Sequence, residues 1–157
     1  MLRNLLLSTP LFLLLAACGP NYSAESEITM DEQGWFYQDS LVAPFNIEDT
    51  SAIYNLYLLL DHQTSFPFQN FYVRIHTTFP GGERLSEQLS LEIAGKAGNW
   101  LGECNSSECS LRIPLQEGAY FNQAGDYRIT IEQFSRRNPL PGLQRVAFAL
   151  EKTGETR

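Results

Sequence analysis

The strongest constraint on the fold of this chain is an alternation of apolar and polar residues with a period of two. Successive side chains of a β-strand point to opposite faces, so this period indicates extended segments with one face in a core and the other in water. The segments that show it are 54–60, 71–76, 85–93, 111–113, 127–132 and 146–150. Alternation dominates the chain, and we expect an all-β domain with little or no helix.

Turn-forming residues separate these segments. Glycine and proline supply the fixed or positive φ that tight turns require, and they occur at 80–82, 95–99, 118, 124–126 and 138–142. With 157 residues the chain has room for one domain. We predict a single antiparallel β-sandwich of about eight strands, jelly-roll or immunoglobulin-like, over residues 34–152, with a C-terminal tail at 153–157. We expect 54–60 and 71–76 to be neighbouring antiparallel strands, and a small barrel that encloses a lipid is the alternative fold.

The N-terminus carries the pattern of an export signal. One positive charge at Arg3 precedes an apolar stretch over 5–17, which is shorter than the roughly 20 residues of a membrane-spanning helix. The stretch ends in Leu-Ala-Ala-Cys, which resembles the lipobox at which bacterial lipoproteins are cleaved and acylated. We predict a signal peptide over 1–17 and lipidation of Cys18. The alternative is an ordinary secretion signal followed by a chance cysteine.

Net charge argues that lipid alone attaches the chain to a membrane. Loss of the signal peptide removes Arg3 and no acidic residue, so the formal charge changes from −7 to −8. A negative surface disfavours nucleic acid as a partner, and it disfavours electrostatic docking on anionic lipid. The polar residues at 18–33 are expected to form the lipidated N-terminus and a flexible tether, with order beginning between Ser26 and Trp35.

The two cysteines that remain after lipidation are predicted to form a disulfide. Cys104 and Cys109 flank the small polar sequence Asn-Ser-Ser-Glu, which is typical of a loop tip, in a compartment where disulfides persist. The alternative is a metal site. Two thiols without a nearby histidine make a poor zinc site, and His62 and His76 lie far upstream.

The sequence contains none of the common catalytic signatures. Gly-x-Ser-x-Gly, His-Glu-x-x-His, the phosphate-binding loop and Gly-x-Gly-x-x-Gly are all absent. His62 follows Asp61 where a strand meets a polar loop, so we expect it in a solvated turn, and we expect His76 on an exposed face. We therefore expect no enzyme activity, no catalytic residue, no metal, no cofactor and no small-molecule substrate.

Aromatic residues suggest a binding surface. Trp35, Tyr57, Tyr72 and Trp100 are candidates for rings that stack on sugars or contact a partner. The alternative is burial in the core of the sandwich, which we favour for Tyr57 and Tyr72 because both faces of a central strand can be covered.

A proline-containing loop supplies further candidate contacts. Residues 135–142 place Arg136 and Arg137 beside the apolar Leu140 on an otherwise acidic domain, and arginine is frequent at interface hot spots. Together with Trp35 and Trp100, these residues are the candidate partner contacts. The alternative is a rigid connection whose arginines keep a sheet edge soluble.

Several short segments, by their order and spacing, resemble the GldH family of gliding motility lipoproteins. They are Trp35, 54–60, 66–72, 98–102, 125–127, Gln133, Arg136 and 140–142, together with the lipobox. The resemblance implies a cell-envelope lipoprotein that is needed for gliding and tied to the type IX secretion system. It implies a non-catalytic accessory or scaffolding component whose partners are the membrane and other gliding or secretion envelope proteins.

The expected location is the periplasm-facing leaflet of the outer membrane. The residues that follow Cys18, Gly19-Pro20-Asn21, contain no acidic export tag of the kind that sends some lipoproteins to the cell surface. The alternative function is that of a glycan-binding β-sandwich lipoprotein. In that case the four candidate rings would share one open face.

Overall fold

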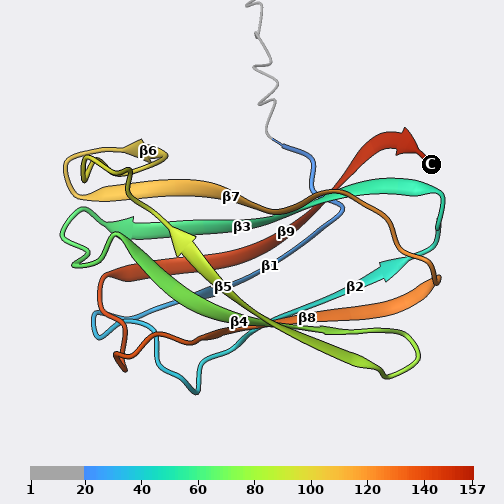
Figure 1. The fold of residues 1–157 in the computed structure, drawn as a ribbon, viewed down its shortest axis with the longest axis horizontal. Helices are drawn as coiled ribbons and strands as arrows, with labels where there is room; N and C mark the ends of the chain where they lie inside the picture. Colours follow the sequence, from blue (N-terminus) through green and yellow to red (C-terminus); the bar gives the residue numbers. More distant parts are fainter. Residues whose placement is uncertain (1–19) are drawn as a thin grey trace, which may run out of the picture.

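The computed structural model describes residues 20–157, in which nine β-strands form two antiparallel sheets packed face to face (Figure 1). The strands are β1 (Ala24–Thr29), β2 (Leu41–Ile47), β3 (Ala52–Gln63), β4 (Asn70–Thr78), β5 (Arg84–Glu92), β6 (Glu103–Cys104), β7 (Glu108–Ala119), β8 (Gly125–Gln133) and β9 (Leu143–Thr156). Within this described part, no helix has the length and apolar character needed to cross a bilayer. The predicted all-β sandwich is confirmed, whereas the predicted signal peptide and lipidated Cys18 lie outside the described residues.

The strand order is that of a jelly roll. The larger sheet has the order β1-β9-β3-β7-β6 and the smaller sheet the order β2-β8-β4-β5. With the two-residue β6 set aside, successive strands change sheet at every connection except the β4–β5 hairpin. Two separate sheets therefore enclose the core, so the alternative of a closed barrel does not apply.

β3 and β9 form the centre of the larger sheet and carry its main core positions. Leu58 lies opposite Phe148 and Leu60 opposite Val146, and all these side chains are at most 1% exposed. From the smaller sheet, Ile131 of β8 is also fully buried. Burial of each such side chain contributes about 1.5–3 kcal/mol, so the apolar faces identified by alternation hold the sheets together.

Two predicted neighbours belong to different sheets. We expected 54–60 and 71–76 to pair, but β3 pairs with β7 and β9, whereas β4 pairs with β5 and β8. The connection over 64–69 crosses from one sheet to the other and buries Phe66 on the way. Alternation identifies the buried face of each strand, but it does not specify the partner strand.

Ordered structure extends beyond both predicted boundaries. The prediction of a flexible tether over 18–33 is wrong for β1, which pairs with β9 along its whole length. β1 is polar on its outer face, but Glu25 and Glu27 bind Arg145 of β9, so a charged segment still joins the sheet. At the other end, most of the predicted tail at 153–157 continues β9.

Candidate functional site

A concave groove opens on the outer face of the smaller sheet, where the β8–β9 loop meets the segment before β2. Its volume is about 1000 Å³, and fourteen residues line it. They come from 37, 68–74, 88 and 132–140. Because these stretches lie far apart in the sequence, only the folded domain brings them together. We call this feature the aromatic groove.

Four rings give the aromatic groove its apolar surface. Tyr37, Phe68, Tyr72 and Phe134 are 36–48% exposed, and they are half of the eight large apolar side chains that are exposed on the described surface. Tyr72 and Phe134 lie on adjacent backbone segments, since the Phe134 amide donates to the Tyr72 oxygen at 2.8 Å. Exposed apolar side chains that gather in one patch mark interaction sites, whereas scattered ones do not.

Gln133 fixes the loop that forms one wall of the groove. Its side chain is 3% exposed, and its Nε2 donates to the main-chain oxygens of Trp35 at 3.3 Å and Arg137 at 2.9 Å. Its Oε1 accepts from the Ser135 amide at 2.6 Å. One buried amide thus satisfies three backbone groups of irregular segments, which holds this wall in a defined position.

Tyr37 is held against the same loop from the other side. Its amide donates to Asn138 Oδ1 at 2.9 Å, and its phenolic oxygen donates to the Ser135 carbonyl at 2.6 Å. Both contacts are made within the domain itself. The ring is therefore positioned before binding, which reduces the entropy that binding would cost.

Two of the predicted contact residues lie beneath the surface. Trp35 is fully buried and Leu140 is 1% exposed, and their backbones exchange two hydrogen bonds of 2.9 Å. Gly34 permits this approach, since its φ is +102° and a Cβ there would lie 2.1 Å from the Leu140 oxygen. The core uses both side chains, so Trp35 cannot serve as an exposed contact and Leu140 contributes only to the floor of the groove.

Three arginines surround the rings. Arg74 lies over the Phe134 ring, with its Cζ 3.9 Å from the centroid, and Arg136 and Arg137 are exposed on the loop. The ion pairs found within residues 20–157 involve none of the three. Three arginines against one carboxylate, Glu132, give the lining of the groove a formal charge of +2 on an acidic domain.

The outer face of the larger sheet differs, because its arginines are neutralised within the domain. Arg145 binds Glu25 at 3.0 Å, Asp61 at 3.4 Å and also Glu27. Partial burial lowers the pKa of Arg145, but Glu27, Asp61 and Glu25 together raise it above its ordinary value. Arg112 pairs in the same way with a glutamate of β9 at 3.2 Å. This face therefore offers less unpaired positive charge to a ligand than the groove does.

His76 is covered, so its predicted exposure is wrong. It is 7% exposed, its Nε2 lies 3.3 Å from Glu132 Oε2, and its Nδ1 lies 2.6 Å from Ser86 Oγ. The residue does point to the outer face, as alternation predicts, but side chains of the two neighbouring strands cover it. Its contact with Glu132 helps to position the one carboxylate of the groove.

His62 is also buried, and the predicted solvated turn is wrong. The ring is fully enclosed, 4.8 Å from the Trp100 ring and 5.7 Å from the Phe66 ring between centroids. Its Nδ1 lies 2.8 Å from the Gln63 oxygen, and its Nε2 has no hydrogen-bond partner among the described residues. β3 continues through Gln63, farther than the alternation indicates, and this carries His62 into the interior.

The four rings chosen from the sequence do not share a face. Trp35 and Tyr57 are buried, and Trp100 is half-buried outside the groove. Only Tyr72 is open, at 48% exposure, and it lies in the groove. Burial was the right prediction for Tyr57 and the wrong one for Tyr72. The difference arises because Arg112 covers the Tyr57 ring, with its Cζ 3.6 Å from the centroid.

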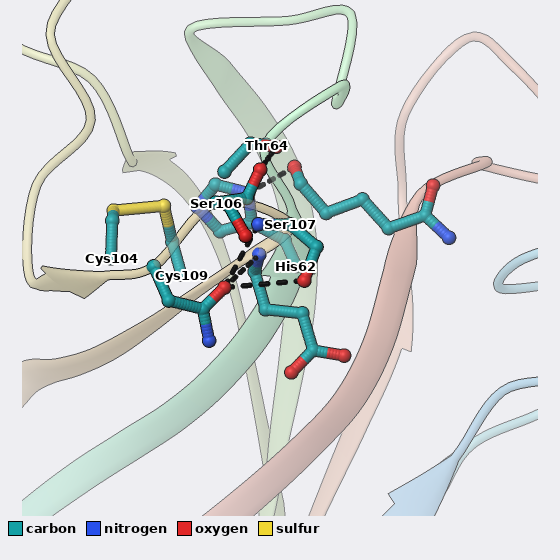
Figure 2. Close-up of a disulfide and its surroundings, with 9 residues drawn as sticks. His62, Thr64, Cys104, Ser106, Ser107 and Cys109 are labelled. Atoms are coloured by element: carbon teal, nitrogen blue, oxygen red, sulfur yellow. Dashed lines mark hydrogen bonds between the residues drawn. A yellow bond between two sulfur atoms is a disulfide. The ribbon is translucent and has the colours of Figure 1, made fainter.

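Cys104 and Cys109 form the predicted disulfide, which closes the β6–β7 hairpin (Figure 2). Thr64, just after β3, binds the tip of this hairpin, because its amide donates to the Ser107 oxygen at 2.9 Å and its hydroxyl to the Ser106 oxygen at 3.3 Å. Since the two sulfurs are bonded to each other, the alternative of a thiol metal site does not apply. In residues 20–157 no group of three or more His, Cys, Asp or Glu side chains is arranged to hold a metal ion.

Comparison with known families identifies the chain. A family model described as GldH lipoprotein matches residues 22–150, from the start of the sandwich to the middle of its last strand. The chain belongs to the GldH lipoprotein family. It is thus a GldH-like lipoprotein related to gliding motility, and GldH lipoproteins are not a known enzyme family. All the residues of the aromatic groove lie within the matched range.

A curated relative agrees with the family match. It is a gliding motility lipoprotein GldH homolog of Christiangramia forsetii, 25% identical over 127 residues, which cover 75% of this chain and 78% of the relative. Among solved structures, the carbohydrate-binding module TmCBM61 in complex with β-1,4-galactotriose is 13% identical, with a TM-score of 0.32 over 84% of this chain and 87% of that one. A likeness at that TM-score carries no argument about fold or ligand.

Sequence reasoning missed most of the aromatic groove. Tyr37, Phe68 and Phe134 lie outside the alternating segments, and Arg74 resembles any solvent-facing residue of a strand. The one available signal is the occurrence of large rings in segments that otherwise have the composition of turns, such as Phe68 next to Pro67. A single exposed ring needs no special explanation, so the site becomes visible only when the fold gathers these rings in one patch.

Proposed function

We propose that this chain is a non-catalytic accessory component of the gliding machinery, linked to the type IX secretion system, and that the aromatic groove is its recognition site. Membership of the GldH family supports the role in gliding. The observation that carries the proposal is the groove itself, in which open rings and arginines with no acidic partner among the described residues gather on an acidic domain.

The placement of the ionisable residues supports binding rather than catalysis. A general acid or base must reach the substrate within hydrogen-bond distance in a cleft. The groove contains one carboxylate, Glu132, and the imidazole that contacts it, His76, is covered. His62 is enclosed by aromatic rings and does not line the groove. A ligand in the groove would therefore meet guanidinium, amide and ring groups and the single carboxylate of Glu132.

We propose that acylation of Cys18 holds the domain near the periplasm-facing surface of the outer membrane. Ala24, the first residue of β1, follows Cys18 by six positions. Extended chain of that length spans about 20 Å, so the link to the membrane is shorter than a tether over 18–33 would be. The domain would then meet envelope proteins of the gliding or secretion apparatus within a narrow zone above the bilayer.

Complementation of a strain that lacks this chain tests the proposal. The variant with Arg136→Gln and Arg137→Gln is expected to lose surface spreading, because the groove loses two of its three cations, while protein level and membrane attachment stay unchanged. The matched control carries Arg84→Gln and Arg128→Gln. These two residues flank Thr78 at the other end of the same sheet and have no ion-pair partner among the described residues.

The control variant is expected to spread as the parent does. Parental spreading by the groove variant would overturn the assignment of the groove as the recognition site. Parental spreading by the strain that lacks the chain altogether would overturn the role in gliding.

A further inference from the structure

We infer that the ligand of the aromatic groove is an acidic oligosaccharide, that is, a segment of a polysaccharide that carries carboxylate groups. The inference rests on the proposed function, in which the groove is a recognition site, and adds the chemical class of what is recognised. The inference is argued from five properties of the groove: its size, the strand pairing of β4 beneath it, its side chains, its charge and its position in the domain.

The size of the groove matches a small ligand or a chain segment. Its volume is about 1000 Å³ and fourteen residues line it. Small-molecule sites occupy about 300–1000 Å³, whereas a stable protein interface uses about 20–30 residues on each side. The volume of the groove is therefore at the upper end of the range for small-molecule sites, and its lining has fewer residues than one side of a stable protein interface.

β4, the strand that forms the floor of the groove, has no free edge, and the edge strand β5 lines the groove only through Gln88. β4 pairs with β5 on one side and with β8 on the other. Where β8 ends, the Phe134 amide donates to the Tyr72 oxygen at 2.8 Å, and the Tyr72 amide donates to Ser135 Oγ at 3.1 Å. A peptide that adds to a sheet needs unpaired backbone groups. Recognition along β4 must therefore come from side chains.

These side chains suit a sugar ring, which has an apolar face of C–H bonds and a rim of hydroxyl groups. Tyr37 and Tyr72, 47% and 48% exposed, present open rings to such a face. The amide side chains of Asn70 and Gln88 line the same groove and supply both donors and acceptors to hydroxyl groups. Phe134 has a different role. Arg74 covers the Phe134 ring, and the ring holds the Arg74 guanidinium in place.

The charge of the groove selects an acidic sugar over a neutral one. Arg74, Arg136 and Arg137 have no carboxylate partner in the described chain, and arginine binds carboxylates through two parallel hydrogen bonds. The domain as a whole is negative, so an anionic polymer is repelled from most of the surface and attracted to the groove.

The place of the groove in the domain points away from lipid. From Ala24, β1 runs toward the end of the sandwich that carries the groove (Figure 1). The chain after β1 stays at that end, because the Met30 amide donates to the Gln144 oxygen and the Trp35 backbone pairs with Leu140. A six-residue strand spans about 20 Å, so the groove lies at the end of the sandwich remote from the start of β1. On a chain acylated at Cys18, that end of the sandwich lies away from the point of lipid attachment.

Calorimetric titration of the full chain, purified in detergent, tests the inference. The probes are oligomers of alginate, polygalacturonate and hyaluronate, with dextran as a neutral sugar polymer and poly-glutamate as an acidic polymer without sugar. At least one carboxylated saccharide is expected to bind about tenfold more tightly than dextran or poly-glutamate, a difference equivalent to one charge-assisted contact. Binding should weaken as salt is raised.

Groove variants then locate the binding. Arg136→Gln with Arg137→Gln is expected to weaken it about tenfold, and Tyr72→Ala to weaken it about fivefold at unchanged charge. The control with Arg84→Gln and Arg128→Gln should bind as the parent does.

The inference is overturned if no carboxylated saccharide binds, if poly-glutamate binds equally well, or if the groove variants bind as the parent does. If saccharides fail to bind while the Arg136 and Arg137 variant still abolishes spreading, the groove remains the recognition site and only its ligand class is wrong. If saccharides bind through the groove while that variant spreads normally, the inference stands and the proposed function fails.

Discussion

The side-chain amide of Gln133 donates a 2.9 Å hydrogen bond to the main-chain oxygen of Arg137, so a buried group of β8 sets the position of an exposed cation. The same amide nitrogen binds the Trp35 oxygen, and Trp35 is fully buried. The Gln133 side chain thereby connects the wall of the aromatic groove to the core. A site whose walls are fixed before binding loses less conformational freedom when the ligand arrives.

Replacement of Gln133 by leucine is expected to lower the free energy of unfolding by about 2–4 kcal/mol, because the Arg137 oxygen and the Ser135 amide lose their partner and the Trp35 oxygen keeps only the Leu140 amide. Urea denaturation of the purified chain measures this. The matched control is Gln88→Leu, an exposed groove residue, which should change the value by less than about 0.5 kcal/mol. A parental midpoint for Gln133→Leu would show that the loop is held by other contacts.

The Gly34→Ala variant is expected to lose about 2 kcal/mol of stability or more, because the added methyl group would lie 2.1 Å from the Leu140 oxygen. Gly82→Ala is the control, since Gly82 also has a positive φ, +89°, but nothing lies within 4 Å of its Cβ position. The Gly82→Ala variant should lose only about 1–2 kcal/mol, the cost of placing a residue with a Cβ at positive φ. Equal losses in thermal or urea denaturation would contradict the proposed steric contact between the segments.

Opening the disulfide is expected to cost about 2 kcal/mol, the value for a short closed loop. Cys104→Ser opens it at the exposed partner and leaves the buried Cys109 in place. The measurement compares the urea midpoints of parent and variant, each with and without reductant. The parent should fall to the level of the variant on reduction, and the variant should not respond. A parent that is insensitive to reductant would refute a stabilising role for the bond.

Tyr57 should make the domain less stable at alkaline pH. Burial of the ring raises the pKa of Tyr57 above its ordinary value of 10.0, against the opposing charge of Arg112. The folded state holds this proton more tightly than the unfolded chain, so the contribution is complete below pH 10 and declines as pH rises through the folded pKa. Tyr57→Phe should therefore show a shallower loss of stability above pH 10 than the parent in a pH series of urea titrations. Identical slopes would contradict the assignment.

The sequence predicts strands and their buried faces because both depend on neighbours along the chain. Leu58 and Leu60 are identified as core by their spacing alone, and both are fully buried. Strand partners depend on the path of the connections instead. In a jelly roll nearly every connection changes sheet, so 54–60 and 71–76 resemble a hairpin in sequence and are separated in the structure. The pairing of β1 was missed because its acids find their partner, Arg145, more than a hundred residues away.

Local sequence patterns do not predict the burial of the histidines or the existence of the groove, because both depend on contacts between residues far apart in the sequence. His76 has the outward orientation that alternation predicts, but Ser86 and Glu132 of the flanking strands cover it. Tyr37 and Phe134 line the same groove only because the β8–β9 loop folds back onto the segment before β2. The two arginines at 136 and 137 were identified because unusual charge in a loop is visible without knowledge of the fold.

The most direct test of the account is whether the aromatic groove is occupied in living cells. Tyr72→p-benzoylphenylalanine places a photoreactive group in the groove, and the same replacement at Tyr120, which is 53% exposed and lies outside the groove, is the control. After irradiation and purification, mass spectrometry is expected to find an adduct that contains uronic acid at position 72 and none at position 120. The absence of any adduct at position 72, or equal adducts at both positions, would contradict the account.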